Sequence, residues 1–94
     1  MQKENNRSLF NLIAPVYGLF YNRQKRRYAE IIRQTASELD LTACQTLLDV
    51  GCGTGALCSV VSGKGLRVTG IDSAEKMLEY ARKQPENRKI RFIH

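Results

Sequence analysis

The pattern of apolar and polar positions changes along this 94-residue chain, and the changes predict its elements. Three short runs, at 46–50, 67–72 and 89–93, are predicted to be strands. The first is apolar and bounded by turn residues, and the second has Val68 and Ile71 as its apolar anchors. The stretch 56–62 can form a helix between the first two runs, and a second helix is expected from Asp72 onward. Strands that alternate with helices are typical of an α/β fold with a parallel sheet and right-handed crossovers.

A helical period governs the part of the chain before the first strand. The apolar positions that follow this period are Tyr28, Ile31, Ile32, Ala36 and Leu39. Further upstream, the apolar stretch 9–21 contains Pro15, which disfavours helical geometry at Ala14 and is expected to end a first helix there. One or two amino-terminal helices are therefore predicted ahead of the sheet.

The loop after the first strand carries the most specific chemistry. The sequence LLDVGCGTG places Gly51, Gly53 and Gly55 at alternate positions at the end of the apolar run. A residue without a Cβ lets the backbone turn sharply and approach a ligand closely. The first N–H groups of the following helix point back toward this loop. Strand, glycine loop and helix in this order predict a nucleotide-type binding turn.

This run resembles motif I of class I S-adenosylmethionine-dependent methyltransferases, whose usual form is close to (L/V)LD(V/L)GCGTG. The resemblance implies that the amino-acid end of S-adenosylmethionine lies over the loop formed by Gly51, Gly53 and Gly55. Asp49 would help to hold the ammonium group of that ligand. Cys52 would offer a backbone N–H and a small side chain.

The same loop also satisfies the G-x-G-x-x-G/A pattern of dinucleotide-binding proteins, through Gly51, Gly53, Ala56 and the later Asp72. A fragment of an NAD-binding, dehydrogenase-type Rossmann domain is therefore an alternative. Asp49 argues against it, because a pyrophosphate favours backbone donors without a carboxylate close by.

The second resemblance begins at the carboxyl end of the second strand. Asp72 follows the run RVTGI, and ligands of open parallel sheets bind outside the carboxyl ends of the strands. Its carboxylate can accept hydrogen bonds from both hydroxyls of a ribose. The run from Asp72 to Leu78 resembles the methyltransferase segment that borders the adenine, which implies contacts from Ser73 and Met77. The capping-box spacing to Glu75 leaves a helix-cap role for Asp72 open.

The third resemblance covers residues 10–17, FNLIAPVY, which are similar to the F-(D/N)-x-I-A-P-x-Y element of quinone-biosynthesis-type methyltransferases. In those proteins the element forms a helix and a loop that cover the donor pocket, which implies a lid role for Tyr17. This chain has Gly18 where the closest relatives often have an acidic residue. Packing of the apolar residues of this stretch in a core is the alternative.

Together, the resemblances imply a truncated α/β, Rossmann-like fold. The family has a seven-stranded sheet, whereas three parallel strands are expected here, in the spatial order 3-2-1 with 46–50 at an edge. Residues 1–43 would form an amino-terminal helical cap segment, and residues 44–94 the first part of the S-adenosylmethionine-binding domain. The sequence thus looks like the amino-terminal portion of an enzyme that methylates a small molecule. We expect the chain alone to be inactive and to self-associate, with strand pairing at its unpaired edge as one route.

The net charge of +6 is spread along the chain, because residues 1–43 (seven basic, four acidic) and 44–94 (eight basic, five acidic) each contribute +3. A solvated helix face explains the basic run 23–27 better than a nucleic-acid interface does, although RNA or anionic lipid remains an alternative partner. No apolar run is long enough to span a membrane, and a cytoplasmic protein is expected.

Cysteine and histidine are too few and too scattered for most catalytic or metal sites. The three cysteines, Cys44, Cys52 and Cys58, form no C-x-x-C pair, and His94 is the single histidine. A metal site or a nucleophilic triad is therefore not expected, and no catalytic residue is predicted. A non-catalytic interaction module remains a further alternative for the function.

Overall fold

The computed structural model describes the backbone of residues 2–94 and the side chains of residues 12, 13 and 15–94. The elements in chain order are α1 Gln2–Gln34, η1 Leu41–Ala43, β1 Thr46–Val50, α2 Ala56–Ser62, β2 Arg67–Ile71, α3 Glu75–Lys83, η2 Pro85–Asn87 and β3 Arg91–Ile93. The strand predicted at 46–50 and the helix predicted at 56–62 are confirmed residue for residue. β2 ends one residue earlier, and β3 begins two residues later, than predicted.

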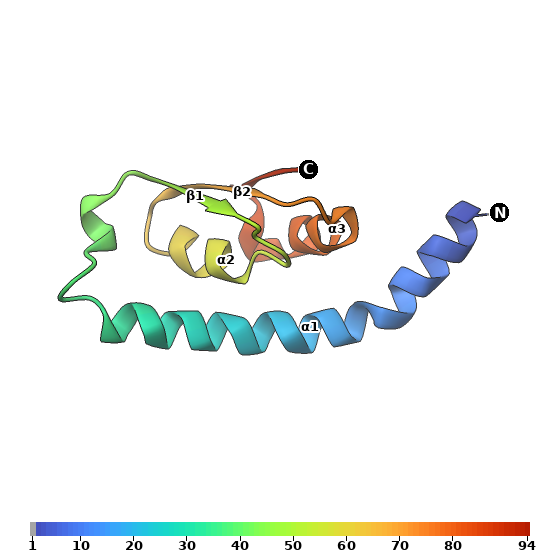
Figure 1. Cartoon of the computed structure of the whole chain (residues 1–94), viewed down its shortest axis with the longest axis horizontal. Helices are drawn as coiled ribbons and strands as arrows, with labels where there is room; N and C mark the ends of the chain where they lie inside the picture. Colours follow the sequence, from blue (N-terminus) through green and yellow to red (C-terminus); the bar gives the residue numbers. More distant parts are fainter. Residues whose placement is uncertain (1) are drawn as a thin grey trace.

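The three strands form one parallel sheet in the order β1-β2-β3, so the predicted spatial order and the edge position of β1 are confirmed. The last residues of the strands, Val50, Ile71 and Ile93, lie opposite one another in the register. Figure 1 shows α2 and α3 on one side of the sheet and α1 running along their outer side. The chain therefore folds as a sheet, a layer of two crossover helices and one long outer helix.

The core lies between the sheet and the crossover helices. Val68 and Phe92 point from the sheet into this layer, where they pack in one cluster with Val61 of α2 and with Leu78 and Ala81 of α3. Side chains alternate between the two faces of a strand, so this core uses every second position.

The opposite face of the sheet is open to solvent among the described residues. Leu48 and Val50 of β1 have side chains that are 61% and 71% exposed, and Ile93 of β3 is 38% exposed. These apolar residues occupy the positions that alternate with the core. The predicted unpaired edge at β1 therefore also carries an uncovered apolar face.

The expectation that Pro15 ends a first helix is wrong, because α1 continues through it from Gln2 to Gln34. A proline inside a helix removes one backbone hydrogen bond and bends the helix, but it does not force the chain out of helical geometry. Figure 1 shows this bend in the first half of α1. After the bend, Tyr17 and Tyr21 lie one turn apart and both pack edge-to-face on Tyr80 of α3. This contact favours the continuous helix.

The amino-terminal element of the sequence analysis lies partly outside the described side chains, because it includes Phe10 and Asn11. Leu12 and Val16 lie inside the described part and are 75% and 64% exposed, so core packing is not their role in this structure. Among the described residues, the structure contains no helix that is long and apolar enough to cross a membrane.

Candidate functional site

The glycine loop after β1 depends on backbone conformations that other residues rarely adopt. Gly51, Gly53 and Gly55 have φ angles of 77°, 56° and 80°, in the left-handed region where a Cβ is strained. The N–H groups of Gly51 and Cys52 both donate to the carbonyl oxygen of Ile71, at 2.8 and 3.0 Å. These two hydrogen bonds fasten the start of the loop to the end of β2.

Beside this loop lies a cavity of about 580 Å³ at the carboxyl ends of all three strands. Its lining residues are Val50, Gly51, Ile71, Asp72, Ser73, Ile93 and His94. Apart from its two chain neighbours, a Cβ atom on Gly51 would have no protein atom within 4 Å, so the glycine leaves free space at the loop. The position agrees with the rule that open parallel sheets bind ligands outside the carboxyl ends of their strands.

Asp72 joins the glycine loop to the turn before α3 at the edge of this cavity. Its Oδ2 accepts a hydrogen bond from the Gly53 N–H at 2.7 Å, and its Oδ1 accepts one from the Ala74 N–H at 2.7 Å. These hydrogen bonds hold the pKa of Asp72 below its usual value, and the bond from Ala74 has the larger effect. The carboxylate is therefore ionised at neutral pH, and each oxygen still has a lone pair for a further donor.

The capping-box interpretation of this segment is wrong. α3 begins at Glu75 with Ala74 as its N-cap, and that residue has no side chain that could cap the helix. Glu75 does not reach back to the chain before the helix, because its carboxylate pairs with Arg82 and His94. The Asp72 carboxylate instead connects the glycine loop to the turn before α3, a long-range contact that a local sequence pattern cannot show.

Asp49 does not line the cavity, and its carboxylate contacts α2. Its Oδ2 accepts a weak hydrogen bond from the Cys58 thiol at 3.5 Å. Burial raises the pKa of Asp49, and the negative charge of Asp72 raises it further. The carboxylates of Asp49 and Asp72 are thus close enough to interact, and a cationic group bound near them would relieve their repulsion.

The thiol of Cys52 is unsuited to nucleophilic chemistry. Burial is the main cause that raises its pKa to about 11, followed by the charge of Asp49. The side chain lies against β2, because a Cβ on Gly70 would be only 2.8 Å from the Cys52 sulfur. A glycine at position 70 is therefore needed beneath the loop, a requirement that the sequence analysis did not identify.

The structure brings some of the predicted site residues to the cavity and places others beside it. Gly51, Asp72 and Ser73 line the cavity directly. The sulfur of Met77 lies near the loop, 3.6 Å from where a Cβ on Gly53 would be. Tyr17 does not line the cavity but packs on Tyr80, with ring centroids 5.9 Å apart.

Four cavity residues were missed by the sequence analysis: Val50, Ile71, Ile93 and His94. The first three share one signal, since each is the last residue of a strand and they face one another across the register. His94 is held by contacts of its two ring nitrogens, with Glu75 at 2.9 Å and with the Ser73 carbonyl oxygen at 3.1 Å. Among the described residues, no group of three acidic, cysteine or histidine side chains is arranged to hold a metal ion.

Comparisons with known proteins agree with this geometry. Residues 47–94 match the sequence profile of the family described as "Methyltransferase domain". Glycine N-methyltransferase of Homo sapiens is 37% identical over 76 residues, which are 81% of this chain and 26% of that protein. Demethylmenaquinone methyltransferase of Tropheryma whipplei is 46% identical over 50 residues, which are 53% of this chain and 21% of that protein.

The crystal structure of Streptomyces venezuelae DesVI superposes with a TM-score of 0.51 at 28% identity, covering 86% of this chain and 35% of that chain. This chain therefore spans between a fifth and about a third of the length of these relatives. The matched segment begins in β1 and includes the glycine loop, Asp72 and β3. By sequence and by fold, this chain belongs to the methyltransferase domain family.

Proposed function

We propose that this chain is the amino-terminal portion of an S-adenosylmethionine-dependent methyltransferase that acts on a small molecule. The observation that carries the proposal is the hydrogen bond between the glycine loop and Asp72, the residue expected to bind the ribose. Asp72 accepts from the Gly53 N–H at 2.7 Å, so the loop and the carboxylate form one unit at the edge of the cavity. A cavity of this size is within the range of small-molecule sites.

The residues present fit the methyl donor. The free lone pairs of Asp72 can accept from the two hydroxyls of an adenosine ribose. The strand ends Val50, Ile71 and Ile93 offer an apolar wall for the adenine, with Ser73 at its border. The space that Gly51 leaves free would admit the rest of the donor close to the backbone.

The donor carries a positive sulfonium and an ammonium group, and the two carboxylates near the loop suit such a cation. Asp49 has a pKa raised by burial and by Asp72, so a cation beside it would stabilise its ionised form. A dinucleotide pyrophosphate would add negative charge at the same place. This contrast supports the methyl donor over the NAD alternative.

When bound, S-adenosylmethionine supplies an electrophilic methyl group for in-line displacement by a nucleophile. The residues of this chain would bind and orient the donor, and the proposal assigns none of them as a general base. Catalysis of such a displacement depends strongly on holding the two reactants within reacting distance. The proposal accordingly assigns donor binding to this chain and keeps the predicted roles of Tyr17 and Met77. For Cys52 it keeps the role of the small side chain, because the N–H of that residue donates to Ile71.

The test is calorimetric titration of the full-length protein with S-adenosylhomocysteine and with NAD. We expect binding of the former and negligible binding of the latter. Asp72→Asn keeps the shape of the side chain but removes its charge, and should weaken binding by about 1–3 kcal/mol, the effect of removing a hydrogen bond to a charged group. Asp40→Asn is the matched control, because Asp40 is exposed and caps η1 away from the cavity. Preferential binding of NAD would refute the proposal.

The same proposal covers the behaviour of this chain alone. It should show no methyl transfer, and its apolar positions Leu48 and Val50 on the open edge strand β1 should promote self-association. Light scattering of the 94-residue chain tests this, and a stable, well-folded monomer would contradict it.

We also propose a cytoplasmic location for the protein. The free thiols of Cys44, Cys52 and Cys58 support this location.

A further inference from the structure

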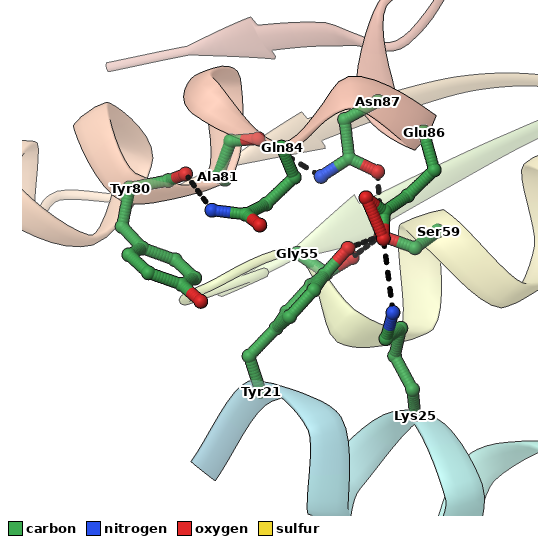
Figure 2. A network of polar contacts seen from close by, with 9 residues as sticks. All are labelled: Tyr21, Lys25, Gly55, Ser59, Tyr80, Ala81, Gln84, Glu86 and Asn87. Carbon is green, nitrogen blue, oxygen red and sulfur yellow. Dashed lines mark hydrogen bonds and ion pairs between the residues drawn. The ribbon is translucent and has the colours of Figure 1, made fainter. Parts of the chain in front are cut away.

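A buried polar cluster lies directly behind the glycine loop (Figure 2). It consists of Tyr21 of α1, Ser59 of α2 and Asn87 of η2, which are 1%, 9% and 2% exposed. The Ser59 hydroxyl lies 2.6 Å from the Tyr21 hydroxyl and 2.6 Å from the Asn87 side-chain oxygen. We call these three residues the Ser59 cluster. At such low exposure their polar groups depend on one another for hydrogen bonds.

The hydrogen bonds of the Ser59 cluster join donors and acceptors from three elements of the chain. Asn87 donates its amide N–H to the Ala81 carbonyl oxygen at 2.9 Å, which fixes its oxygen toward Ser59 as an acceptor. The Gly55 carbonyl oxygen, 2.8 Å from the Ser59 oxygen, is also only an acceptor. The single Ser59 proton can serve only one acceptor at a time. In the contact between the Tyr21 and Ser59 hydroxyls either oxygen can donate, and the Glu86 carboxylate also interacts with the Tyr21 hydroxyl.

Tyr21 is held in position by its surroundings. Burial raises the pKa of Tyr21 to about 12, so the hydroxyl keeps its proton at neutral pH. Its ring packs edge-to-face on Tyr80 at 5.6 Å, and the Lys25 ammonium lies 4.4 Å from the ring centroid. Lys25 also pairs with Glu86 of η2 at 2.9 Å, which fastens α1 to the same region (Figure 2). The ring of Tyr21 therefore has little freedom to move away from Ser59.

The Ser59 cluster reaches the site through Gly55, the third glycine of the loop. Gly55 is the N-cap of α2 in a left-handed conformation, and no side chain caps that helix. The Ser59 hydroxyl holds the Gly55 carbonyl on one side. On the other side, a Cβ on Gly55 would lie 3.0 Å from the Phe92 ring and 3.2 Å from the Ala81 Cβ. Asn87 donates a hydrogen bond to the carbonyl oxygen of that same Ala81. The Ser59 cluster therefore holds both the Gly55 carbonyl group and a residue that packs against Gly55.

We propose that Tyr21, Ser59 and Asn87 are positioning residues that set the affinity for the methyl donor by fixing Gly55 and, through it, the glycine loop. The inference rests on the proposed function, because it concerns the ligand of the same site. It adds residues that do not touch the cavity and a physical link from α1 to the loop. Through this link, α1 contributes to donor binding without lining the site.

The experiment uses full-length protein and two variants that each remove one hydroxyl, Tyr21→Phe and Ser59→Ala. Titration with S-adenosylhomocysteine should show a dissociation constant raised about three- to ten-fold in each, the scale of one lost internal hydrogen bond. The double variant should lose less than the product of the single effects, because both act through one bond. Amide exchange at Thr54 and Gly55 should be faster in both variants, since the loop is less restrained.

Two controls separate positioning from general stability. Tyr80→Phe removes a hydroxyl from the neighbouring ring, which has no hydrogen bond to Ser59, and should leave the dissociation constant within two-fold. Ile90→Val removes a methyl group from the core cluster and should lower the melting temperature without weakening donor binding. The inference is overturned if Ser59→Ala binds S-adenosylhomocysteine as tightly as wild type does. It is also overturned if Ile90→Val and Ser59→Ala lower the melting temperature equally and weaken binding equally. Wild-type protein that binds no S-adenosylhomocysteine would instead refute the proposed function, and the inference with it.

Discussion

Replacement of Gly55 by alanine should destabilise the chain more than replacement of any solvent-facing glycine of the same backbone conformation. The φ angle of 80° puts an L-residue in the left-handed region, at a cost of about 1–2 kcal/mol. The new Cβ would also lie 3.0 Å from two carbons of the Phe92 ring and 3.2 Å from the Ala81 Cβ, which are buried and cannot move freely. Overpacking of this kind costs about 1–3 kcal/mol.

The two effects add to a loss of about 2–5 kcal/mol in the free energy of unfolding. Small domains have total stabilities near the low end of about 5–15 kcal/mol, so Gly55→Ala should be close to unfolded. The assay is urea denaturation followed by circular dichroism, with the midpoint and slope fitted for each variant.

Gly65→Ala is the matched control, because Gly65 has a φ of 91° and a Cβ there would meet no atom within 4 Å. It should show the backbone cost alone. Gly51→Ala, at 77° and also without neighbours, should match Gly65→Ala in stability but weaken donor binding, since Gly51 lines the cavity. Equal losses for Gly55→Ala and Gly65→Ala would refute the steric argument.

Four further predictions follow from individual side chains of the site. Asp72 has a folded-state pKa below its usual value of 3.8, so its ionised carboxylate stabilises the fold above that pH. In acid titrations, the difference in stability between wild type and Asp72→Asn should vanish as the pH falls through the folded-state pKa. Burial raises the pKa of Asp49, so ionisation of this carboxyl opposes folding at pH 7. Asp49→Asn should therefore be more stable than wild type at pH 7 but should bind S-adenosylhomocysteine more weakly. Equal stability of the two proteins at pH 7 would contradict the argument from burial. Thr54 is 2% exposed and its hydroxyl has no hydrogen-bond partner among the described residues, so Thr54→Val should raise the free energy of unfolding by about 1 kcal/mol or more, and a loss in urea denaturation would speak against it. Cys52, with a pKa of about 11, should react with iodoacetamide at pH 7.5 far more slowly than the exposed Cys44, as peptide mass spectrometry can measure, and equal rates would rule out the burial argument.

Local elements of this protein could be predicted from the sequence because their signals are local. The apolar run 46–50 and the three alternate glycines after it determine a strand, a left-handed loop and a helix start, and the structure agrees at each residue. The spatial order of the strands was also predictable, because right-handed crossovers leave few arrangements for three parallel strands. The acid at the end of the second strand, Asp72, lies at the cavity as expected.

Tertiary contacts decided the features that the sequence left open or indicated wrongly. Pro15 lies within the single helix α1, which Tyr17 and Tyr21 hold against Tyr80 of α3, 63 and 59 residues later along the chain. Asp72 bonds to Gly53, 19 residues earlier, in place of capping its own helix. The sequence order likewise contains no signal that joins Tyr21 to Ser59, 38 residues later. A pattern of neighbouring residues reports the backbone that those residues prefer, whereas a buried hydrogen bond depends on which donor and acceptor the packed helices bring together.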